Sequence, residues 1–235
     1  MREIAAIIFD FGGTLDNDGL DWFVRLYDLL DPRGMSLGRE EFYRYTKQAA
    51  QQLDEWADTR RLTMDQTVER LCRQLKKLIT DDRGNGRGHW EPAQIAAEFM
   101  QPAQKFLGRN RRLLEQLRRR FRLGVISNNW GNTAGWCEQF QLSEYLETVI
   151  DSTLVGAAKP DRIIFESALA TLDLSAGACA YVGDRFESDV FGAYQAGMRT
   201  VWITGGQDKE CPDESMVGYR VEKLTDILDL DWTSR

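Results

Sequence analysis

Short apolar runs alternate with helical patterns along most of the chain. The first run, Ile4–Phe9, is unbroken and ends at Asp10. Comparable runs follow at 122–127, 148–151, 178–182 and 200–203. Unbroken apolarity over so few residues is typical of a strand that is covered on both faces, as in a parallel sheet. Helical spacing at 161–172 and 189–196 separates the later runs. The pattern therefore predicts an α/β fold with a Rossmann-like, doubly wound parallel sheet.

A long helical stretch interrupts this alternation after the first run. Residues 39–83 contain neither Gly nor Pro, and Val68, Leu71 and Leu75 recur there at helical spacing. Residues 22–30 carry a shorter helical pattern. We therefore predict an all-α insert at 17–91, so that residues 1–16 and 92–235 form the core domain.

Glycine and proline residues predict two further element boundaries along the chain. The run 81–88 is rich in Asp and Gly, which predicts a loop. Pro92 is well placed to open a helix with Phe99 on its apolar face, and a further helix carries Leu113 and Leu117.

Composition narrows the class of protein. The chain has 235 residues, with 30 Lys and Arg against 37 Asp and Glu, a formal charge of −7. This balance argues against nucleic acid as a partner, and no apolar run has the length of a membrane span. The four cysteines are scattered without a C-x-x-C pair, which favours reduced thiols in a cytoplasmic protein.

Polar residues follow the predicted strands where parallel strands place ligands, beyond their carboxyl ends. Asp10 and Thr14 follow the first strand, and Ser127 and Asn128 end the second. Lys159 precedes a helix, and the pair Gly183-Asp184 follows a later strand, with Asp189 five residues on. Each residue alone is an ordinary turn or cap residue, but their order along the chain is distinctive.

These motifs resemble those of the haloacid dehalogenase superfamily. The matching segments are Phe9-Asp10-Phe11-Gly12-Gly13-Thr14-Leu15, Val125-Ile126-Ser127-Asn128, Lys159-Pro160-Asp161 and Gly183-Asp184 through Asp189. The resemblance covers about residues 4 to 205, and the helical insert is similar to the α-helical (C1-type) cap domain of this superfamily.

The resemblance implies a role for each matching residue. Asp10 would be the nucleophile that forms an aspartyl-phosphate. Mg²⁺ would be held by Asp10, the Gly12 carbonyl and Asp184, with Asp189 in support. Ser127 and Lys159 would act in catalysis on the phosphoryl group, and substrate would be bound by Thr14, Ser127, Asn128 and Lys159. Without a cation, the three carboxylates would repel one another and raise their own pKa values.

Gly12 departs from the pattern of the phosphatases in this superfamily. They place a second Asp two residues after the nucleophile, where it protonates the leaving oxygen and later activates water. Positioned acid–base groups contribute about 10² to 10⁴ in rate, so the missing side chain is a large change. A main-chain carbonyl for the metal is kept, because any residue supplies one.

Three interpretations remain open. The first is a Mg²⁺-dependent phosphatase of a small phosphorylated metabolite, using an acidic leaving group or a displaced acid such as Asp16, Asp18 or a cap residue. The second is a silent protein that binds a phosphorylated ligand or a partner protein. The third is C–P or C–halogen hydrolysis; dehalogenases lack the Gly-Asp-x₄-Asp motif found here, and phosphonatases need a cap lysine. We favour the first interpretation, and we expect the protein to be a monomer or a homodimer.

Overall fold

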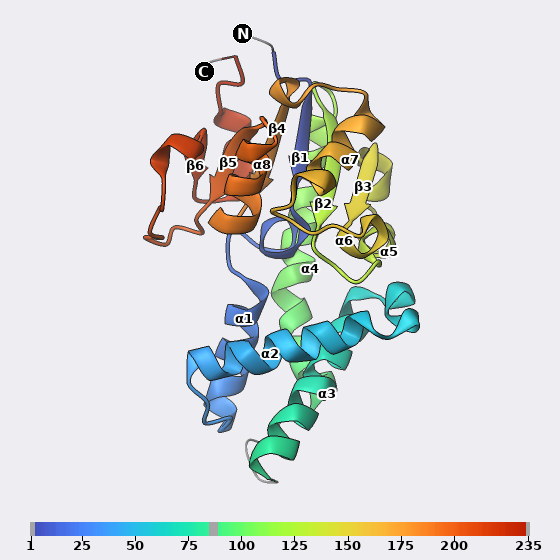
Figure 1. The fold of residues 1–235 in the computed structure, drawn as a ribbon, viewed down its shortest axis with the longest axis vertical. Coiled ribbons are helices and arrows are strands. Elements are labelled where there is room, and N and C mark those ends of the chain that lie inside the picture. The colour runs from blue at the N-terminus through green and yellow to red at the C-terminus, as the bar shows by residue number, and fades with distance from the viewer. Residues whose placement is uncertain (1–2, 85–88, 234–235) are drawn as a thin grey trace. The chain divides into compact units, whose positions relative to one another are not determined.

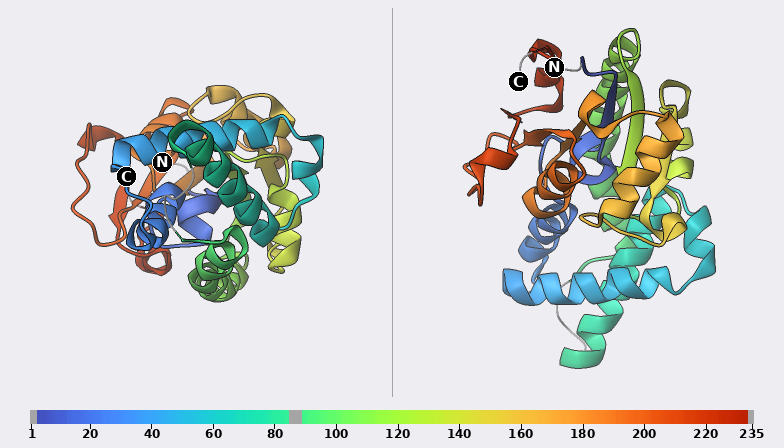
Figure 2. Two further views of the ribbon diagram at one scale, coloured as in Figure 1. Left: turned by 90° about the horizontal axis from the view of Figure 1, so that it is seen from below. Right: turned by 45° about the horizontal axis from the view of Figure 1, so that its top comes forward.

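A single parallel sheet organises the larger part of the molecule. The computed structural model describes residues 3–84 and 89–233. In this described part, the strand order is β3-β2-β1-β4-β5-β6, and every neighbouring pair is parallel (Figure 1). The strands are β1 (Ala6–Phe9), β2 (Arg122–Ser127), β3 (Thr148–Asp151), β4 (Cys179–Gly183), β5 (Arg199–Ile203) and β6 (Tyr219–Val221). The second view of Figure 2 shows β1 in blue between the green β2 and the orange strands. The predicted α/β fold with a doubly wound parallel sheet is confirmed.

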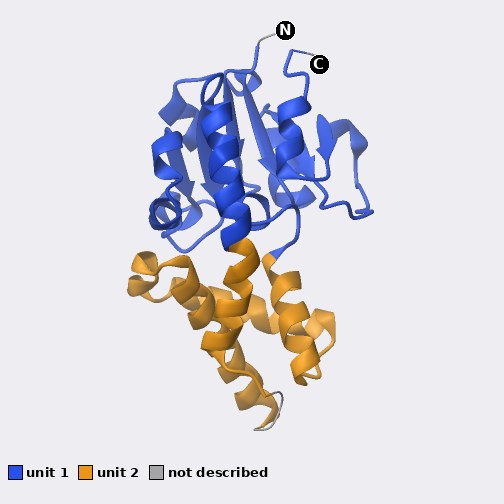
Figure 3. Ribbon diagram, turned by 180° about the vertical axis from the view of Figure 1, so that it is seen from behind, with its two compact units in different colours: residues 1–21, 104–235 blue, residues 22–103 orange. Residues whose placement is uncertain are grey.

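Helices cover the two faces of this sheet. Figure 1 shows α7 and α8 in front of it, and Figure 3, seen from behind, shows the C-terminal part of α4 on the other face. The α-helices are α1 (Trp22–Leu30), α2 (Arg39–Asp54), α3 (Met64–Arg83), α4 (Pro92–Leu117), α5 (Thr133–Gln139), α6 (Ser152–Val155), α7 (Arg162–Leu172) and α8 (Phe191–Gln195). Shorter helical turns are Phe11–Leu15, Asp31–Arg33, Ala57–Arg61, Ser143–Tyr145, Ala176–Ala178, Phe186–Val190, Glu214–Met216 and Leu224–Asp229.

The central strands β1 and β4 are buried on both faces, as their apolar runs predict. All four residues of β1 and all five of β4 are buried. On one face, Ala6 and Ile8 pack in a cluster with Phe165 of α7 and Ala193 of α8. This double cover fixes the central strands and therefore the loops that leave their carboxyl ends.

The chain divides into two compact units, coloured in Figure 3. Unit 1 comprises Met1–Asp21 and Gln104–Arg235, and unit 2 comprises Trp22–Ala103. These bounds differ from the predicted insert at 17–91. Residues 17–21 group with unit 1 because they are tied to it: Arg109 makes two hydrogen bonds to the Asp18 carboxylate, at 2.6 and 2.7 Å. That unit 2 serves as a cap domain stays a prediction.

Unit 2 is helical and has its own apolar core. Leu26 of α1, Leu53 of α2, Leu71 of α3 and Phe99 of α4 are all buried at 1% exposure or less. At the start of α3, the Gln66 side chain accepts a hydrogen bond from the Thr63 main-chain N–H at 3.1 Å, as in a capping box. The helical periodicity of the insert is therefore reproduced.

Two local predictions differ from the structure, and some of its elements were not predicted. The predicted pair of helices after Pro92, the second of them carrying Leu113 and Leu117, is one helix, α4, because its buried stripe continues through Leu107 and Asn110. Residues 81–83 end α3 instead of starting a loop, while 85–88 lie outside the described residues. The short edge strand β6 and helix α5 were not predicted.

None of the helices among residues 3–84 and 89–233 combines the length and apolar character that a membrane crossing requires.

Candidate active site

Three aspartates meet at the carboxyl edge of the sheet. Asp10 directly follows β1, and its main-chain N–H donates to the Val182 carbonyl of β4 at 2.9 Å. Asp184 directly follows β4, and Asp189 lies in the turn after it. Carboxylate oxygens of Asp10, Asp184 and Asp189 lie within 4.8 Å of one another, and all three residues are buried. The sequence prediction assigned Asp10, the Gly12 carbonyl and Asp184 to the metal, with Asp189 in support, and the structure brings the three aspartates together.

Lys159 contacts two of these three carboxylates directly. Its Nζ lies 2.6 Å from Asp10 Oδ1 and 2.7 Å from Asp189 Oδ1. Its side chain is only 3% exposed. Burial by itself lowers the pKa of Lys159, but the charges of Asp10 and Asp189 outweigh burial and raise that pKa above its ordinary value. Lys159 is therefore a fixed cation against the two carboxylates.

Tyr181 of β4 completes the surroundings of Lys159, and it was not predicted as a site residue. Its hydroxyl accepts a hydrogen bond from Lys159 Nζ at 2.9 Å and donates to the Ile126 carbonyl at 3.2 Å. Burial, followed by the charge of Asp189, raises the pKa of Tyr181 well above its ordinary value, so the hydroxyl keeps its proton. The available signal was a lone hydroxyl in an otherwise apolar strand, because such a group needs a partner.

Two glycines allow the loops to approach so closely. A Cβ at Gly13, which has a φ of +85°, would lie 2.6 Å from an Asp184 carboxylate oxygen. A Cβ at Gly183 would lie 2.4 Å from the Cβ of Asp189. Side chains at either position would push the carboxylates apart, so these glycines are part of the construction of the site.

The remaining predicted site residues surround the cluster in different ways. Thr14 is fully buried, and its hydroxyl donates to Asp184 Oδ1 at 3.4 Å. Asn128 clamps the main chain of Lys159: its amide nitrogen donates to the Lys159 carbonyl at 3.0 Å, and its oxygen accepts the Lys159 N–H at 2.8 Å. Ser127 is buried at the end of β2. Substrate contacts of these residues stay predictions, and the amide of Asn128 is engaged in positioning Lys159.

The electrostatics of the cluster favour a bound cation. Burial raises the pKa of Asp10 to about 7, with Lys159 opposing the shift and Asp189 adding to it. Burial and the charges of Asp189 and Asp10 raise the pKa of Asp184 well above its ordinary value. The charge of Lys209 opposes the shift at Asp184, but the three carboxylates still outnumber the two lysines, Lys159 and Lys209, that act on them. Converging hard oxygen donors of this kind fit Mg²⁺, whose charge would let them all ionise.

Gly12 has an ordinary backbone conformation. Its φ of −77° and ψ of 121° lie in the region that any L-residue adopts. Glycine is therefore not required there by the main chain, and the absence of an acidic side chain is not a consequence of the turn.

The two aspartates named as displaced acids are engaged nearby. Asp16 Oδ1 accepts the Gly13 N–H at 2.6 Å. The carboxylate of Asp18 binds Arg109 and also accepts the Leu224 N–H at 3.0 Å. Asp18 is thus occupied in holding its own segment of unit 1.

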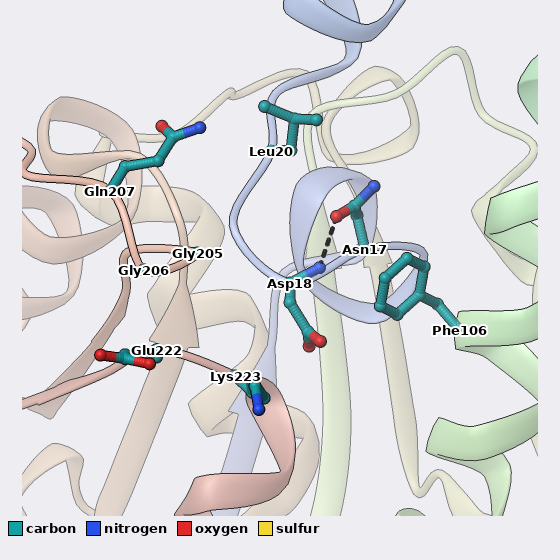
Figure 4. A pocket seen from close by; sticks show the side chains of 9 residues that line it. All are labelled: Asn17, Asp18, Leu20, Phe106, Gly205, Gly206, Gln207, Glu222 and Lys223. Atoms are coloured by element: carbon teal, nitrogen blue, oxygen red, sulfur yellow. Dashed lines mark hydrogen bonds between the residues drawn. The ribbon is translucent and has the colours of Figure 1, made fainter.

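A cavity of about 310 Å³ in unit 1 lies beside this segment (Figure 4). It is lined by Asn17, Asp18, Leu20, Phe106, Gly205, Gly206, Gln207, Glu222 and Lys223. Figure 4 shows the hydrogen bond within it, from the Asp18 N–H to Asn17 Oδ1 at 2.7 Å. Its polar lining residues come from the segments that follow β1, β5 and β6, and its apolar side chains are Leu20 and Phe106.

Known proteins resemble this chain in sequence. The chain is 36% identical over 113 residues to the glyceraldehyde 3-phosphate phosphatase of Pyrococcus abyssi, covering 46% of this chain and 47% of that protein. The protein of the same name from Methanopyrus kandleri is 26% identical over 196 residues, covering 72% of this chain and 82% of that one. This chain spans about half the length of several of the curated relatives it matches.

The fold also has solved counterparts. The magnesium-bound HAD-hydrolase YfnB of Bacillus subtilis superposes with a TM-score of 0.57 at 19% identity, covering 97% of this chain and 98% of that one. The family model of the haloacid dehalogenase-like hydrolases matches residues 4–197. The motif residues of that segment converge at one edge of the sheet, and the chain belongs to the haloacid dehalogenase-like hydrolase family.

Proposed function

We propose that this protein is a Mg²⁺-dependent phosphatase that acts on a small phosphorylated metabolite through an aspartyl-phosphate on Asp10. The observation that carries the proposal is the buried contact of Lys159 with both Asp10 and Asp189, beside Asp184. The relatives named glyceraldehyde 3-phosphate phosphatase support the same class of reaction.

Lys159 prepares Asp10 for attack. Its Nζ binds Asp10 Oδ1, which favours the ionised carboxylate and fixes its orientation. A carboxylate oxygen of Asp10 then attacks phosphorus, the P–O bond to the leaving group breaks, and the leaving group keeps that electron pair. Bound Mg²⁺, held by Asp10, the Gly12 carbonyl and Asp184 with Asp189 in support, would neutralise phosphoryl charge. Water next attacks phosphorus, releasing inorganic phosphate and regenerating the Asp10 carboxylate.

Gly12 shapes the choice of substrate in this scheme. No side chain at this position can protonate the leaving oxygen, so a leaving group of low pKa is favoured, such as an acyl or phenolic oxygen. The same absence slows the attack of water, because no base at this position removes its proton. We therefore expect the second half of the reaction to limit turnover.

Two accompanying proposals concern the setting of the enzyme. All four cysteines, at positions 72, 137, 179 and 211, are free thiols, which supports a reducing compartment such as the cytoplasm. A monomeric or homodimeric state stays a prediction.

The test is a screen of phosphorylated metabolites, with acetyl phosphate and p-nitrophenyl phosphate as activated references, in Mg²⁺ and in EDTA. We expect phosphate release in Mg²⁺ that EDTA abolishes. Mg²⁺-dependent binding of beryllofluoride without turnover of any ester would instead identify a silent phospho-ligand-binding protein. Halide release from 2-haloacids in EDTA would identify a dehalogenase.

A further inference from the structure

Lys209 lies in the loop after β5, outside the motifs of the predicted site, and binds main-chain oxygens from three segments. Its Nζ lies 2.8 Å from the Gly19 carbonyl oxygen, 3.1 Å from that of Asp184 and 3.5 Å from that of Ile203. An ammonium group has three donors, and these acceptors can use all of them.

The Asp184 carbonyl is held from two directions. Besides Lys209, the indole N–H of Trp202 donates to it at 2.9 Å, and Trp202 is 1% exposed in β5. The direction of the Asp184 carboxylate depends on this main chain, because its side chain is short. Two donors from β5 and the following loop therefore set the orientation of a predicted metal ligand.

The contact with Gly19 extends this support to the other loop of the site. The Gly19 N–H donates to the Gly13 carbonyl at 2.7 Å, which closes the loop that begins at Asp10. Lys209 thus connects the loop after β1 to the loop after β4. In the proposed function these two loops supply Asp10, the Gly12 carbonyl and Asp184 to the same cation.

We propose that Lys209 is a positioning residue that holds these two loops at the spacing Mg²⁺ requires and places a positive charge behind Asp184. Mg²⁺ demands nearly ideal octahedral geometry, so a small displacement of one loop costs affinity. This proposal rests on the proposed function, since it concerns the same metal site.

The test compares Lys209→Met, Lys209→Gln and Lys209→Arg with the wild-type chain. Mg²⁺ binding to each whole protein is measured by calorimetry without substrate, alongside the Mg²⁺ concentration for half-maximal turnover. Removal of outer partners of metal ligands typically weakens metal binding by about 10- to 100-fold. We expect a loss of about tenfold or more for Lys209→Met, a smaller loss for Lys209→Gln, which keeps donors without the charge, and substantial rescue by Lys209→Arg. The KM for substrate at saturating Mg²⁺ should change little.

Lys105→Met is the matched control, because Lys105 is an exposed lysine of α4 in the same unit. Folding of every variant is checked by its urea unfolding midpoint. If Lys209→Met does not fold, Lys209→Gln decides. Folded variants with wild-type Mg²⁺ affinity would overturn the role of Lys209 and leave the proposed function standing. A wild-type protein that binds no Mg²⁺ would overturn both.

Discussion

At the scale of single residues, the site depends on how Lys159 shares its donors. Two of its partners are carboxylates and the third is the Tyr181 hydroxyl. The ammonium can therefore stabilise Asp10, the proposed nucleophile, only while Asp189 and Tyr181 keep it in place. Asp189 is a charged partner of Lys159 and Tyr181 is a neutral one. Mutation of each can therefore separate the effect of charge on Lys159 from the effect of its position.

Gly12→Asp should raise phosphatase activity. The backbone at Gly12 accepts an L-residue, and a carboxyl group there can protonate the leaving oxygen and later activate water. We expect kcat to rise by roughly tenfold or more, up to the factor of about 10² to 10⁴ that positioned acid–base groups contribute, and more for alkyl phosphates than for p-nitrophenyl phosphate. Gly12→Asn is the control of equal size. Equal rates for the folded Asp and Asn variants on an alkyl phosphate would contradict the idea that an acid is missing.

Tyr181→Phe should reduce both stability and turnover. The change removes a buried hydroxyl that donates to the Ile126 carbonyl and accepts from Lys159 Nζ, and the loss of such buried contacts costs about 1 to 3 kcal/mol in the free energy of unfolding. Lys159 also loses an acceptor that orients it, and we expect kcat to fall by roughly tenfold or more. Urea unfolding and steady-state kinetics measure the two effects. Tyr194→Phe is the control, because Tyr194 is an exposed tyrosine of α8, and it should change neither stability nor kcat. A Tyr181→Phe variant with wild-type stability and kcat would contradict the role of Tyr181 in orienting Lys159.

At the scale of elements, the ends of β1 and β4 define the site. The two strands pair directly, with Phe9 opposite Val182, so the loops that follow them emerge side by side. Their close approach depends on small residues at the crossing points, Gly13 and Gly183.

Gly183→Ala should therefore disturb the site from within the sheet. Its new methyl group would overlap Asp189, and overpacking of this kind costs about 1 to 3 kcal/mol. Gly177→Ala is the control, because nothing lies within 4 Å of the added Cβ. We expect a lower unfolding midpoint and weaker Mg²⁺ binding only for Gly183→Ala. The same behaviour in both variants would argue against steric control of Asp189.

The sequence predicted the elements that have strong periodicity and left out those that lack it. The apolar run at β1 and the motif after β4 placed Asp10 and Asp184 correctly at strand ends. β6 has only three residues, too few for a pattern, and the apolar positions predict two helices on either side of residues 107–112, where α4 is continuous. Lys209 carried no signal, because a lysine in a polar loop is ordinarily solvated and its three acceptors are main-chain groups from distant segments.

At the scale of the whole molecule, the proposed metal site predicts that stability depends on Mg²⁺. Mg²⁺ that binds the folded protein alone stabilises it by mass action, by about 2.7 kcal/mol at a concentration 100 times its Kd. We expect the urea midpoint to rise accordingly in Mg²⁺ relative to EDTA, and Asp184→Asn to lose most of that rise. Identical midpoints for the wild-type protein in Mg²⁺ and EDTA would contradict a metal site at the three aspartates.

The central claim is that Asp10 carries the phosphoryl group during turnover, and trapping that group tests it most directly. In the proposed scheme Gly12 slows the attack of water, so the intermediate should accumulate with acetyl phosphate in Mg²⁺. Acid quenching followed by peptide mass spectrometry should find one phosphoryl group on the peptide that contains Asp10, and Asp10→Asn should show neither the modification nor turnover. Turnover of Asp10→Asn at the wild-type rate, or a phosphoryl group on another residue, would contradict the account.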